Sequence, residues 1–100
     1  MTSDLTISVG EIRAVLGRVL DAVEREHGPE LTFEHDYYWA LPVAASSDMT
    51  AAAPTLTVGQ VSNDIEEIRE LADGPDVVAT WHELAHALGV LRAVEALIQP

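Results

Sequence analysis

The chain has 100 residues, of which 48% are hydrophobic, and this length predicts a single domain over residues 1–100 with its own core. Seventeen acidic residues stand against five arginines, so a net charge of -12 argues against binding to nucleic acid or anionic lipid. The chain has no cysteine, which excludes disulfides, thiolate metal sites and a cysteine nucleophile.

The first predicted element is a helix over residues 9–27. Ser8 followed by Glu11 is the spacing of a capping box, in which the serine side chain accepts a hydrogen bond from the helix's first turn. Gly28 and Pro29 end the helix, since glycine tolerates a left-handed cap and proline cannot continue the helix. Apolar residues recur at helical spacing between these signals: Val9, Ile12, Val15, Leu16, Val19, Leu20 and Val23.

Two strands are expected next. Residues 31–41 alternate and are rich in aromatic residues, which is typical of a strand. We expect Phe33 and Trp39 to pack in the core and Tyr38 to lie on the opposite face. Residues 42–55 read as a loop, and a short strand at 56–58, ended by Gly59, is expected to pair with the first.

Two helices complete the chain. Ser62 or Asn63 is the expected cap of the second helix, and the segment 73–75 ends it. The third helix is predicted over about 77–98. Its expected core face is apolar: Val77, Trp81, Leu84, Ala85, Leu88, Leu91 and Ile98.

The order helix, strand, strand, helix, helix predicts an α+β fold in which a small antiparallel hairpin or sheet packs on three helices. A lone hairpin is marginally stable in water, so a third strand, or strand pairing between two subunits of a homodimer, stays open. The N-terminus has no signal-peptide pattern and no segment is apolar enough to span a membrane, so we expect a cytoplasmic protein.

One motif has the form of a metal site. His82, Glu83 and His86 match H-E-x-x-H, in which two histidines four residues apart on a helix bind zinc and the glutamate activates a bound water. The match continues to Gly89, and this segment resembles the zinc-binding helix of metzincin peptidases. That family has a third histidine where this chain has Arg92.

We interpret this resemblance as coincidental, because the expected core stripe leaves His82 and His86 on the solvated side without a third donor. His27 and His35 join them only if the fold brings them near. The favoured hypothesis therefore has no cofactor and no catalytic residue. The alternative is a minimal zinc hydrolase with His82 and His86 as ligands and Glu83 as the base.

A second resemblance covers most of the chain. Residues 36–39 read D-Y-Y-W, and residues 56–64 read L-T-V-G-Q-V-S-N-D. These segments resemble a group of short uncharacterised bacterial proteins with a D-Y-Y-W strand and an L-T-x-G-Q-x-S-x-D turn. The resemblance implies a small accessory protein, similar to immunity partners of toxins, without a known catalytic activity.

The leading hypothesis from the sequence is an acidic protein-interaction module. Tyrosine is favoured at contact surfaces, and Tyr38 is expected beside Glu34 and Asp36 on one face of the strand. Because the net charge is strongly negative, we expect the partner of these three residues to be a basic protein.

Overall fold

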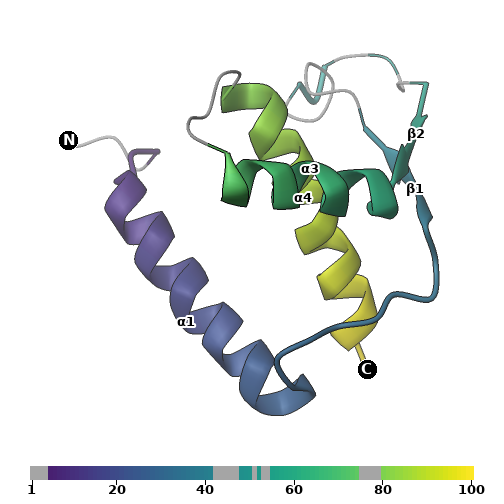
Figure 1. The fold of residues 1–100 in the computed structure, drawn as a ribbon. Coiled ribbons are helices and arrows are strands. Elements are labelled where there is room, and N and C mark those ends of the chain that lie inside the picture. The colour runs from purple at the N-terminus through teal and green to yellow at the C-terminus, as the bar shows by residue number, and fades with distance from the viewer. Residues whose placement is uncertain (1–4, 42–47, 51, 53–54, 75–79) are drawn as a thin grey trace. The chain divides into compact units, whose positions relative to one another are not determined.

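A computed structural model describes residues 5–41, 48–50, 52, 55–74 and 80–100. Its elements are α1 (Val9–His27), β1 (Tyr37–Ala40), β2 (Thr57–Gln60), α3 (Val61–Asp73) and α4 (Thr80–Ile98), coloured in chain order in Figure 1. The α+β class and the predicted order of elements are confirmed. The chain forms two compact units, residues 1–32 and 33–100, and the single domain expected from its length stays a prediction.

The first unit is built on α1, whose two ends are those expected from the sequence. The Ser8 hydroxyl accepts a hydrogen bond from the backbone N–H of Glu11 at 3.0 Å. At the other end Gly28 has φ of 91° and donates its N–H to the carbonyl of Glu24 at 2.8 Å. A residue with a Cβ is strained at this φ, so glycine is what allows the helix to end here.

The second unit begins with an antiparallel hairpin of β1 and β2. Each strand is only four residues long. Trp39 pairs with Val58 and Tyr38 with Gly59, which places Gly59 within the second strand. The prediction that Trp39 lies in the core, with Tyr38 on the opposite face, was wrong. Tyr37 and Trp39 are 66% and 71% exposed, whereas Tyr38 points into the unit. The predicted loop at 42–55 lies largely outside the described residues.

Helices α3 and α4 pack on each other (Figure 1), and both contribute to the small core of this unit. Val61, Gly89 and Val94 are buried there. The expected core stripe of the last helix was wrong, because Trp81 is 75% exposed and Leu84 and Leu88 are also exposed. The face of α4 that meets α3 instead carries His86 and Gly89, both of which lie against Asp64. Val77 lies outside the described residues.

Asp36 joins the segment before β1 to the start of α3. Its carboxylate accepts hydrogen bonds from the backbone N–H of Ser62 at 2.7 Å, the Ser62 hydroxyl at 2.9 Å and the side-chain amide of Gln60 at 3.1 Å. Asp36 thus caps α3 from a distant part of the chain, where the sequence suggested Ser62 or Asn63. The backbone N–H of Ser62 is the main cause that lowers the pKa of Asp36 below its ordinary value.

No helix in the described part of the chain is both long and apolar enough to cross a membrane.

The Asp36 cap predicts a pH dependence of stability. Because the pKa of Asp36 is lowered in the folded chain, the unfolded chain binds more protons as the pH falls. The cap therefore stabilises the fold above the ordinary aspartate range and is lost as the pH falls through the folded pKa. The urea midpoint of the wild type should fall with pH between about pH 5 and pH 2, and we expect Asp36→Asn to make this fall shallower. Glu34→Gln, at an exposed position, should keep the wild-type fall, and equal profiles for both variants would contradict this role.

Candidate functional site: a histidine pair ordered by a buried aspartate

Asp64 lies at the centre of the second unit, in the first turn of α3. It is only 4% exposed, yet both carboxylate oxygens have partners. Oδ2 accepts a hydrogen bond from the Tyr38 hydroxyl at 2.6 Å, and Oδ1 lies 2.7 Å from Nδ1 of His86. A carboxylate this buried is tolerated only when such partners replace its water. One side chain thus connects β1, α3 and α4.

Two glycines make room for this arrangement. A Cβ added at Gly59 would overlap the ring of Tyr38, and one added at Gly89 would overlap the Asp64 carboxylate. The same Cβ at Gly89 would lie 2.5 Å from the Tyr38 hydroxyl. Gly89 is therefore the point at which α4 approaches α3 closely enough for His86 to reach Asp64.

The Tyr38 hydroxyl is held as a hydrogen-bond donor. Burial of the ring and the adjacent Asp64 carboxylate raise the pKa of Tyr38 to about 12. The phenol consequently stays protonated throughout the physiological range and donates to Asp64.

His86 is oriented by the same carboxylate. A carboxylate can only accept, so a neutral His86 ring that donates from Nδ1 to Asp64 presents a lone pair on Nε2. This Nε2 lies 3.1 Å from Nε2 of His82, one helical turn earlier, and the two rings meet edge to face. His86 is 12% exposed, whereas His82 is exposed. The prediction that both imidazoles lie on the solvated side was therefore wrong for His86.

A third donor joins this histidine pair. A carboxylate oxygen of Glu67 in α3 and one ring nitrogen from each histidine all lie within 4.8 Å of one another. Glu67 is half-buried and lies one turn after Asp64 on the same helix. In the described part of the chain, His27 and His35 do not belong to this cluster.

Glu67, His82 and His86 form a donor set with known metal chemistry. Two imidazoles and one carboxylate are the ligands of a class of catalytic zinc sites, which leave a fourth position for water. Tetrahedral zinc with bonds of about 2.0–2.1 Å separates its two nitrogens by about 3.3 Å, close to the spacing found here. Asp64 on Nδ1 of His86 supplies the outer carboxylate that typically orients such a histidine.

The other predicted site residues lie outside this donor set. Glu83 is half-buried on α4, between the two histidines in sequence. Glu34 and Tyr38 line a 390 Å³ pocket, together with residues from α3 and α4. Asp36 does not line that pocket, since its carboxylate binds the start of α3. Sequence reasoning missed Asp64 and Glu67 as partners of the histidines. The signal for them was a pair of acids three residues apart on the preceding helix.

Comparisons with known proteins add no assignment to this geometry. No family model matches the chain, and no curated protein and no solved structure shows significant similarity to it.

The tight approach at Gly89 gives a testable effect on stability. Gly89→Ala must displace Asp64 or α4, so we expect the free energy of unfolding to fall by about 1–3 kcal/mol, measured by urea titration. Gly17→Ala is the matched control, because this helical glycine has nothing within 4 Å of its Cβ position. Alanine there should stabilise α1 by up to about 1 kcal/mol. Equal effects at both glycines would show that α4 tolerates a side chain at residue 89.

Proposed function

We propose that this protein binds a zinc ion through Glu67, His82 and His86 and uses the open coordination position for hydrolysis. The observation that carries the proposal is the 3.1 Å approach of the two Nε2 atoms while Asp64 engages the opposite side of the His86 ring. A hydrogen bond between the imidazoles would also give this distance. The nearby Glu67 carboxylate favours a cation, since it supplies negative charge where two neutral rings supply none.

The chemistry of the proposed site follows from its ligands. A zinc ion lowers the pKa of a water in its fourth position and so supplies a nucleophile near neutral pH. Glu83 follows His82 directly and is the candidate base for that water, as the H-E-x-x-H spacing indicates. Asp64 holds the proton on Nδ1 of His86, which keeps Nε2 available as a ligand.

Zinc titration of metal-free, untagged protein tests the binding step. We expect one zinc ion per chain, measured by competition with a chromophoric chelator, and a rise in the unfolding temperature on binding. His82→Ala and Glu67→Gln should lose this binding. Asp64→Asn should weaken it by about 10- to 100-fold through His86. Glu66→Gln is the matched control, because this acid lies next to Glu67 but outside the donor set.

Hydrolysis is tested separately with Glu83→Gln, using an activated aryl ester as the substrate. This variant should bind zinc like the wild type and lose zinc-dependent hydrolysis. A chain that takes up no zinc would remove the whole proposal. Zinc binding without hydrolysis in the wild type would remove only the enzymatic part.

A second candidate function, binding of a basic protein, is favoured by the outer face of the hairpin. Tyr37 and Trp39 are exposed on β1, and Val58, the cross-strand neighbour of Trp39, is 60% exposed. Large aromatic residues on a surface are typical anchors of protein contacts. Glu34 is also exposed, and the net charge of -12 favours a cationic partner such as a toxin domain.

Capture from native lysate tests this second function. We expect the immobilised protein to retain one basic protein, with less retained as the salt concentration rises. Trp39→Ser should abolish the capture, whereas Trp81→Ser, an equally exposed tryptophan on α4, should not. Recovery that does not differ between these variants would speak against the hairpin as a binding surface.

A further inference from the structure

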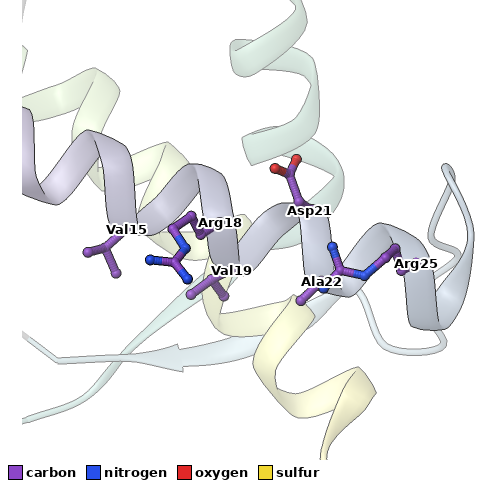
Figure 2. Close-up of a pocket in the computed structure, with 6 residues that line it drawn as sticks. All are labelled: Val15, Arg18, Val19, Asp21, Ala22 and Arg25. Carbon is purple, nitrogen blue, oxygen red and sulfur yellow. The ribbon is translucent and has the colours of Figure 1, made fainter.

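A groove along α1 combines apolar side chains with alternating charges. Val15, Val19 and Ala22 form its apolar side. The charged side follows the order Arg18, Asp21, Arg25, and Figure 2 shows the two guanidinium groups following one another along the helix. We call these six residues the α1 groove. Both arginines and both valines are exposed, so the groove presents apolar surface and positive charge in a chain that is otherwise acidic.

A groove along α3 has the opposite pattern of charge. It is lined by Ser62, Ile65, Glu66, Arg69, Glu70 and Asp73, which we call the α3 groove. Three of these residues, Glu66, Arg69 and Asp73, follow one another at intervals of three and four residues. All three are exposed. None of the six residues belongs to the donor set of the proposed zinc site.

The row of Glu66, Arg69 and Asp73 is the charge inverse of a row with the same spacing in the α1 groove. The charged row of the α1 groove reads positive, negative, positive, also at intervals of three and four. The two ends of each row are seven residues apart, or about 10.5 Å at the rise of an α-helix. We infer that α1 of one copy of this chain packs in parallel on α3 of a second copy. The charges then pair in order: Arg18 with Glu66, Asp21 with Arg69, and Arg25 with Asp73.

The apolar residues of the two grooves are consistent with the parallel direction. At 100° per residue, Val15 and Val19 lie on one side of the charged row of α1, and Ile65 lies on one side of the row of α3. When the two helices run in parallel, these sides coincide and the apolar residues meet. The antiparallel direction separates them and brings Asp21 towards Glu70.

A second copy is a suitable occupant because it carries both faces. Around a two-fold axis the same contact forms twice, so both grooves of both copies are filled. α1 holds three of the five arginines, so it offers the acidic surface of another copy more positive charge than either of the other two helices. Exposed ion pairs contribute little each, so the charges set the register. Most of the affinity comes from the valines, which the proposed contact would bury.

Charge reversal tests the proposed dimer. We expect sedimentation equilibrium to show a dimer of the wild type at low salt that dissociates as the salt rises from about 0.02 M to about 0.5 M. The double variants Arg18→Glu/Arg25→Glu and Glu66→Arg/Asp73→Arg should each dimerise at least about tenfold more weakly. Arg13→Glu is the control, because Arg13 lies on α1 outside the groove.

Mixing the two double variants distinguishes a second copy from the same chain. When either variant dimerises with itself, like charges face each other at the contacts. A mixed pair restores opposite charges at both contacts. We therefore expect a heterodimer of wild-type affinity. A monomeric wild type, unaffected dimers in both reversals, or a mixture that stays monomeric would each overturn the inference.

Cysteine cross-linking provides a measurement that leaves the charges unchanged. The chain has no cysteine of its own, so Val15→Cys and Ser62→Cys can be placed on separate copies. The proposed register brings these positions to within about one residue of the same height. Oxidation of the mixture should yield a disulfide-linked heterodimer, whereas Leu5→Cys mixed with Ser62→Cys should yield none. Absence of the first product would also overturn the inference.

Discussion

The second unit depends on one buried carboxylate. Asp64 is almost fully removed from water, and an ionised carboxylate in such a place is strongly unfavourable unless hydrogen bonds replace its hydration. Tyr38 and His86 provide those bonds at 2.6 and 2.7 Å. Each donor comes from a different element, so the requirement to satisfy Asp64 also fixes how β1 and α4 sit on α3. Removing any of the three leaves a buried polar group without its partner, which is a larger cost than the loss of one surface contact.

This constraint explains why the sequence predicted the elements but not their inner faces. Helix caps, alternation and turn residues are local signals, and they located α1, the hairpin and the last two helices in the right order. The choice of inner face was made by hydrophobicity, which placed Trp39 and Trp81 in the core. In the folded chain both tryptophans are exposed, because the inner faces are chosen by Tyr38 and His86 reaching Asp64. A buried polar network of this kind outweighs the hydrophobicity of single side chains, and it produces no periodic pattern in the sequence.

The candidate metal site was predictable to the extent that it lies on one helix. His82 and His86 are four residues apart, so their motif is readable from the chain alone. Glu67 lies on α3, and only the packing of α3 on α4 brings its carboxylate to the imidazoles. That packing requires Gly89, whose missing side chain lets the helices approach. The third ligand therefore depends on a tertiary contact between two helices, which the sequence alone does not show. The wrong assignment of the inner face of α4 also placed His86 away from α3.

The D-Y-Y-W strand, the turn that begins α3 and the histidine motif of α4 contact one another in the second unit. Asp36 binds Ser62, and Tyr38 binds Asp64 and covers Gly59, so the D-Y-Y-W strand and the following turn are complementary partners. The histidine motif joins them through His86 and Gly89. A cation held by His86 would draw on its Nε2 and strengthen the demand of Nδ1 for the Asp64 carboxylate. Metal binding between α3 and α4 would therefore affect the hairpin through the hydrogen bond of Tyr38 to Asp64. Tyr38 in this way connects the proposed zinc site to the strand that carries Tyr37 and Trp39.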